Sequence, residues 1–130
     1  MKRILIGVLA MAVLVGGAQA RAAPATEEAT AMGDLFAGTL EIDVPAGDWS
    51  AKRYFAPDHT YRETGSDGEV HGAWSIDQGK VCAQADKPAL GPDRAARYCN
   101  AILGRHAGER WTDADPVTGN TVFFTLKAGR

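Results

Sequence analysis

From residue 38 onward, apolar side chains alternate with polar ones in short runs, and clusters of turn-forming residues separate the runs. A period of two is typical of strands that bury one face, because successive side chains of a strand point to opposite sides. The clearest apolar rows are Leu40, Ile42 and Val44; Val70, Gly72, Trp74 and Ile76; and Val122, Phe124 and Leu126. The chain is therefore predicted to form strands, not long helices, after residue 38.

The spacing of runs and turns predicts about eight short strands, with a turn roughly every 8 to 12 residues. Strands that follow one another through tight turns form antiparallel meanders, and a small domain can protect its edge strands by closing into a barrel. We predict that residues 38–130 form an all-β domain, a small antiparallel meander barrel. A two-sheet β-sandwich is the alternative.

Residues 1–20 have the pattern of a secretory signal peptide. Lys2 and Arg3 precede an apolar run from residue 4 to residue 15, and Ala18-Gln19-Ala20 provides a small-x-small cleavage site. The run is shorter than the roughly 20 apolar residues that a membrane-spanning helix needs. We expect the mature chain to begin near Arg21, to have no transmembrane segment, and to be periplasmic or secreted.

Residues 21–37 are predicted to be a flexible N-terminal segment with a short helix. Ala, Pro, Thr and Glu dominate the first ten of these residues, which is typical of a mobile terminus. Thr26 is a suitable N-cap for a helix that carries Glu27 and Glu28 in its first turn and runs toward Phe36. Gly38 is expected to end that helix.

Cys82 and Cys99 are the two cysteines of the chain. An even number of cysteines in an exported protein favours a disulfide. A redox pair or a metal site is the alternative, but the cysteines of a redox pair usually lie close together in the sequence as Cys-x-x-Cys. If the polar loop Asp86–Ala95 joins neighbouring antiparallel strands, the two cysteines lie nearly opposite each other. Closing a loop of roughly 18 residues would stabilise the fold by about 3 kcal/mol.

The charge distribution argues against nucleic acid as a partner. The full chain has a formal charge of −2, and loss of Lys2 and Arg3 with the leader makes the mature charge about −4. Binding of a phosphate backbone needs clustered Lys and Arg, and no such block or stripe is present.

The residue types that carry catalysis or bind metals lack the spacing that those functions need. His59, His71 and His106 form no close ligand pair, and His59 and Glu63 would be about 13 Å apart along one strand. The serines lie outside Gly-x-Ser-x-Gly, and the Asp113–Asp115 pair is better explained as turn chemistry than as a calcium site. We predict neither enzyme activity nor a metal or other cofactor.

The aromatic side chains and Arg53 are the better candidates for a binding function. Most of the aromatic residues must fill the interior of so small a barrel, but Phe123 faces opposite to Phe124, so one of the two lies outside the main core. Arg53 interrupts an apolar row; it either lies at a strand edge with its charge in water, which is the simplest interpretation, or sits at a bulge, or points into a pocket to receive an anionic group. The candidate ligand-binding residues are Arg53, Tyr54, Tyr61 and Phe123.

A succession of short motifs resembles one group of small secreted bacterial proteins. The motifs are Tyr54–Asp58, Gly72–Ile76, Gly79–Cys82, Tyr98-Cys99 and Gly108–Trp111. They resemble the strands and turns of proteins of unknown function that have a lipocalin-like (calycin-type) barrel, and the resemblance extends from Gly38 to the last residue. It implies a barrel fold and a compartment outside the cytoplasm.

A second resemblance is to periplasmic metalloprotease inhibitors, small barrels with one disulfide that block a protease cleft with a mobile N-terminal segment. Residues 21–30 have the character of such a segment, although the Gly-x-Trp motif of those inhibitors lies near the N-terminus and here lies at residues 72–74. We expect a non-enzymatic binding module for a small apolar or amphipathic ligand or for an envelope protein. The alternative is an inhibitor of a protease or another envelope enzyme that acts through its N-terminal segment.

Overall fold

The computed structural model describes residues 23–87, 95 and 97–130. The predicted signal peptide, the expected start of the mature chain and most of the Asp86–Ala95 loop lie outside these residues. The described residues form two helices, eight strands and one short 3-10 helix: α1 (Ala23–Ala31), α2 (Gly33–Ala37), β1 (Gly38–Val44), η1 (Pro45–Gly47), β2 (Trp49–Phe55), β3 (Thr60–Gly65), β4 (Gly68–Asp77), β5 (Lys80–Ala85), β6 (Arg97–Asn100), β7 (Arg110–Ala114) and β8 (Thr121–Ala128). Within the described part of the chain, neither helix is long and apolar enough to cross a bilayer.

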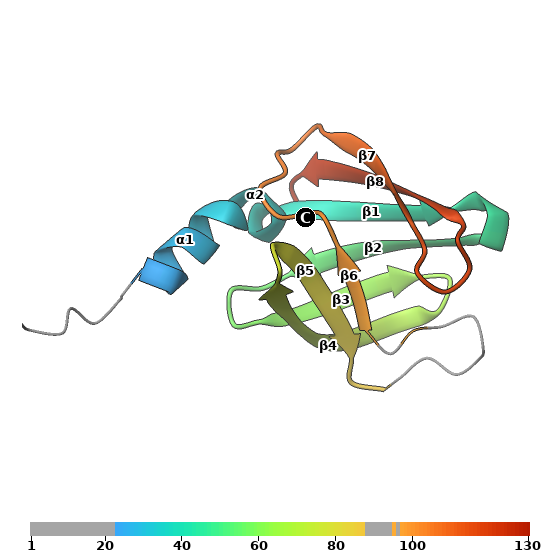
Figure 1. Ribbon diagram of the computed structural model, residues 1–130, viewed down its shortest axis with the longest axis horizontal. Coiled ribbons are helices and arrows are strands. Elements are labelled where there is room, and N and C mark those ends of the chain that lie inside the picture. The colour runs from blue at the N-terminus through green and yellow to red at the C-terminus, as the bar shows by residue number, and fades with distance from the viewer. Residues whose placement is uncertain (1–22, 88–94, 96) are drawn as a thin grey trace, which may run out of the picture.

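The eight strands form one sheet in the order β6-β5-β4-β3-β2-β1-β8-β7, and each neighbouring pair is antiparallel. The sheet curls round on itself into a nearly closed barrel, in which β6 and β7 are the two edge strands (Figure 1). The predicted all-β antiparallel barrel is confirmed. The alternative of two stacked sheets is wrong, because β1 pairs with both β2 and β8 and so joins all strands into one sheet.

The inward-facing rows are those that the alternation predicted. Trp74 and Phe124 are each 2% exposed, whereas Phe123, on the opposite face of β8, is 48% exposed. The pairing of Ile42 with Phe124 places the β1 and β8 rows side by side. Hydrophobic burial of these rows is the main favourable contribution to folding.

One end of the barrel is closed by α2 and by the segment that leads from β6 to β7. Met32 and Leu35 are fully buried there, and the Phe36 ring contacts Trp74 with 5.8 Å between ring centroids. The amide of Gly104 donates to the Ala31 carbonyl at 3.1 Å, which ties the segment to the end of α1. Figure 1 shows that α2 lies against the barrel while α1 extends away from it.

The predicted N-terminal helix forms, but its boundaries differ from the expectation. The structure has two helices that meet at Met32, and Thr26 lies inside α1 instead of capping it. The interruption allows Met32 and Leu35 to enter the core together. Gly38 ends the helical segment, as expected, and begins β1.

The cysteine pair confirms the predicted register of β5 and β6. Cys82 lies directly opposite Cys99, and the two form a disulfide with 3.9 Å between their Cα atoms. Both belong to the row that faces away from the barrel interior, since their neighbours Val81 and Ala83 face inward. The disulfide therefore attaches edge strand β6 covalently to the rest of the sheet.

Gly72 leaves the space in which the Tyr61 ring lies across the sheet. A Cβ atom at Gly72 would be 2.6 Å from Cε1 of Tyr61, 2.2 Å from the carbonyl oxygen of Gln84 and 2.9 Å from Cα of Ala85. Any larger residue at position 72 would have to displace backbone as well as the ring. This close approach explains why the apolar row of β4 contains a glycine.

Candidate functional site

The half of the barrel away from α2 contains a cavity of about 720 Å³ that opens at the end formed by the turns. Its apolar wall is formed by inward-facing side chains of several strands and includes Ile42, Val44, Val70, Ala83, Val122 and Phe124. Ligand cavities of proteins are usually about 300–1,000 Å³ in volume, so this one is large enough for a small organic molecule.

Side-chain size explains why one half of the barrel is hollow and the other is solid. Near α2, the large residues Phe55, Trp74 and Leu126 fill the interior and are almost completely buried. Toward the open end, β5 contributes the small side chains of Ala83 and Ala85 to the cavity wall. Small residues on an inward row leave volume that the opposite strands do not fill.

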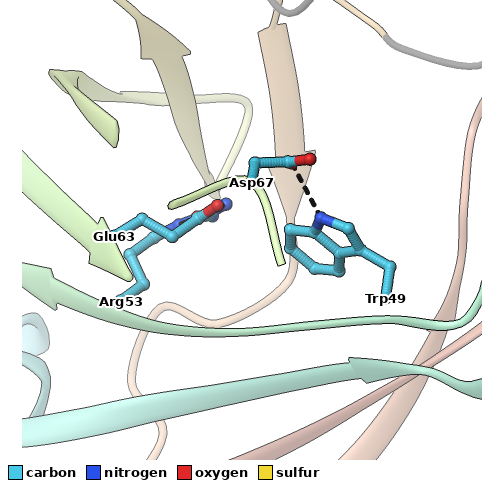
Figure 2. Close-up of polar contacts among 4 residues, drawn as sticks. All are labelled: Trp49, Arg53, Glu63 and Asp67. Atoms are coloured by element: carbon cyan, nitrogen blue, oxygen red, sulfur yellow. Dashed lines mark hydrogen bonds and ion pairs between the residues drawn. The ribbon is translucent and has the colours of Figure 1, made fainter. Parts of the chain in front are cut away.

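Arg53 and Glu63 form a buried ion pair in the wall of the cavity, on the neighbouring strands β2 and β3 (Figure 2). The Nε–H of Arg53 donates to Oε2 of Glu63 at 2.7 Å, and Nη2 lies 2.6 Å from the same oxygen. Each side chain is 8% exposed. The interpretation of Arg53 as a strand-edge residue with its charge in water is therefore wrong: its side chain turns inward because Glu63, directly opposite, supplies a partner.

The ion pair has unused hydrogen-bonding capacity. Nε and Nη2 of Arg53 both contact Oε2 of Glu63, so among the described residues Nη1 of Arg53 and Oε1 of Glu63 have no hydrogen-bond partner. Both residues line the cavity, and neither of these two atoms is sealed off from solvent, so a molecule in the cavity can reach them. A guanidinium has five donors and a carboxylate about four acceptor sites, so the pair offers both a donor and an acceptor to a bound molecule.

Tyr61 lies beside this pair and also lines the cavity. The guanidinium carbon of Arg53 is 5.2 Å from the centroid of the Tyr61 ring, which is a cation–π contact. Burial raises the pKa of the Tyr61 phenol above its usual 10.0, and the charge of Arg53 opposes this shift. The phenol is therefore neutral at physiological pH and available as a hydrogen-bond donor.

The mouth of the cavity carries an aromatic side chain and charged groups. The indole Nε1 of Trp49 donates to Oδ2 of Asp67 at 2.8 Å, which holds the ring at the β3–β4 turn (Figure 2). Lys87 and Asp115 contribute to the rim from the β5–β6 and β7–β8 connections. Asp115 is fixed there because its carboxylate accepts hydrogen bonds from two amides of its own turn.

The four residues that the sequence suggested for ligand binding divide into two groups. Arg53 and Tyr61 line the cavity. Tyr54 lies on the outer face of β2, where the Arg62 guanidinium is 4.6 Å from the centroid of its ring, and Phe123 lies on the outer face of β8. The structure therefore brings two of the four together and places the other two outside the barrel.

Sequence reasoning missed Glu63 as part of the cavity and considered it only as a companion of His59. The signal was present, because Glu63 has the same parity as Tyr61 and interrupts an inward-facing row as Arg53 does. Two opposite charges on adjacent inward rows indicate a buried pair.

The histidines lie outside the cavity. The imidazole of His59 stacks on Trp74 with 4.2 Å between ring centroids, and its Nε2 is 2.5 Å from Oε1 of Glu28 in α1. Within the part of the chain that the structure describes, no group of three or more His, Cys, Asp or Glu side chains is placed to hold a metal ion. The role of His59 visible here is to connect α1 to the barrel.

Comparison with protein-family models, with curated proteins and with solved structures gave no match. The eight antiparallel strands form a nearly closed barrel, which is consistent with the calycin-type barrel that the sequence motifs suggested.

Proposed function

We propose that this protein binds a small apolar or amphipathic molecule inside its barrel and does not transform it chemically. The observation that carries the proposal is the cavity of about 720 Å³, which has an apolar wall and a buried ion pair in it. This combination is typical of small-molecule sites, in which apolar side chains supply affinity and a few polar groups fix orientation.

The sequence gives independent support for such a role outside the cytoplasm. The pattern of residues 1–20 is that of an exported protein, and a disulfide is typical of an oxidising compartment. Several of the motifs that resemble small secreted lipocalin-like proteins lie on β2, β4, β5 and β6, and these four strands also contribute to the cavity wall. We propose a periplasmic or secreted carrier or sensor of a small ligand.

The test uses a neutral, polarity-sensitive fluorophore, N-phenyl-1-naphthylamine, whose emission rises when it enters an apolar site. Val70→Phe places a larger side chain on the cavity wall, so we expect it to weaken binding of the fluorophore by roughly tenfold or more. Ala73→Phe is the matched control, because residue 73 lies on the same strand but is exposed on the outer face.

Thermal unfolding of both variants, followed by circular dichroism, checks that the barrel is intact. Saturable binding by the wild type and by Ala73→Phe, with loss in Val70→Phe, supports the proposal. The proposal is wrong if the wild type binds no apolar or amphipathic probe, or if the two variants bind equally well.

A further inference from the structure

We infer that the cavity selects ligands with a neutral, amide-like polar head and discriminates against free carboxylates. This inference rests on the proposed function, which it deepens by naming the class of ligand. A lone inward-facing arginine would favour an anion, so the partner of Arg53 decides the chemistry.

Glu63 neutralises Arg53 before any ligand arrives. The two side chains are each 8% exposed and are joined by contacts of 2.6 and 2.7 Å. A ligand carboxylate that entered would leave water without gaining an unpaired cation, and it would also meet the negative charge of Glu63. A neutral head avoids both penalties.

The unused atoms of the pair match an amide. Nη1 of Arg53 is a donor and Oε1 of Glu63 is an acceptor, and neither has a partner among the described residues. The carbonyl oxygen of a primary amide accepts from the guanidinium, while its NH₂ group donates to the carboxylate. A carboxylate can accept but cannot donate, so it leaves Oε1 without a partner and repels it.

The experiment compares three ligands that share one alkyl chain and differ in the head group: octanamide, octanoate and octylamine. Each is titrated against the full-length mature protein at about pH 8 by displacement of N-phenyl-1-naphthylamine, with calorimetry as a second readout. We expect octanamide to bind roughly tenfold to hundredfold more tightly than octanoate, because two hydrogen bonds to charged groups distinguish them. Octylamine should also bind more weakly than octanamide, because its ammonium cannot accept from Arg53.

Glu63→Gln tests the assignment to this ion pair. The substitution keeps the shape of the side chain but leaves the charge of Arg53 unmatched, so the preference should shift toward octanoate by roughly tenfold or more. Asp67→Asn is the matched control: it also removes one negative charge from the lining, but at the mouth, and should leave octanamide preferred.

The outcomes separate the two proposals. If none of the three ligands and no apolar probe binds the wild type, the proposed binding function is wrong. If the wild type binds the probe but prefers octanoate or octylamine to octanamide, the binding function stands and the head-group inference is wrong. Equal head-group preference in wild type and a folded Glu63→Gln variant also overturns it.

Discussion

Removing one member of the Arg53–Glu63 pair should destabilise the barrel strongly, whereas removing both should cost little. The variants are Arg53→Met, Glu63→Leu and the double variant, which replace each side chain with an apolar one of similar size. The physical reason is that the attraction between the two charges of a buried ion pair offsets their desolvation, whereas nothing offsets the desolvation of a single buried charge.

The magnitude follows from the burial and contacts of the pair. Both side chains are 8% exposed and their contacts are 2.6 and 2.7 Å, which places them in the class for which loss of one partner costs about 3–5 kcal/mol. We expect about 4 kcal/mol for Glu63→Leu, because the guanidinium that remains cannot lose its charge. Arg53→Met should cost about 3 kcal/mol, because it also leaves one charge of the pair buried without its partner.

The double variant should differ from the wild type by less than about 1 kcal/mol, since apolar replacements of buried pairs are often neutral or stabilising. The assay is urea unfolding at neutral pH, followed by circular dichroism, with the dependence on urea concentration compared among the four proteins. Two results would refute the reasoning: a double variant as unstable as the single ones, or single variants that each cost less than about 1 kcal/mol. The second result would mean that the charges of the pair remain solvated, and the first would mean that the two side chains stabilise the barrel by something other than their mutual attraction.

Three further predictions concern the rest of the fold. Gly72→Ala should destabilise the barrel by about 3 kcal/mol in urea unfolding, because the new Cβ would overlap backbone and the Tyr61 ring. Gly33→Ala is the control and should be neutral or slightly stabilising, because no atom lies within 4 Å of its new Cβ. An equal effect of the two substitutions would contradict the packing argument. Replacing both Cys82 and Cys99 with Ala should lower the free energy of unfolding by about 3 kcal/mol, since the disulfide closes a loop with a sequence separation of 17; an unchanged unfolding midpoint under oxidising conditions would show that it does not constrain the unfolded chain. Burial raises the pKa of Tyr61 above 10.0, so the folded state holds the phenol proton more tightly than the unfolded state does. The stability that this difference contributes is complete below pH 10.0 and is lost as the pH rises toward the folded pKa. Tyr61→Phe should therefore lose less stability than the wild type over this alkaline range, and parallel pH profiles of the two proteins would contradict the assignment.

Much of the fold followed from local patterns. The alternation around Ile42, Trp74 and Phe124 predicted which faces are buried, because a strand has no way to bury adjacent residues on the same side. The opposition of Cys82 and Cys99 followed from parity and from one assumption about the connecting loop. The helix boundaries were less predictable, because the interruption at Met32 depends on packing against Leu35 and the barrel end, which overrides local propensity.

The candidate site was predictable only in part. Arg53 was noticeable because a charge on an apolar row is unusual, but three orientations were open to it. The sequence did not indicate which one holds, because the choice depends on whether the neighbouring strand presents a carboxylate at the same level. Tyr54 and Phe123 are aromatic residues on strands like Tyr61, yet their rows face outward.

The sequence by itself determined where the strands lie, which face is buried in the strands around Ile42, Trp74 and Phe124, and where the chain turns, because these depend on residues near one another along the chain. The tertiary structure decided that one end of the barrel is solid and the other hollow, and that Arg53 meets Glu63 inside it. Free volume depends on the sum of the side chains that many strands bring to one level, and the fate of a buried charge depends on what stands opposite it. Neither quantity exists until the sheet has closed.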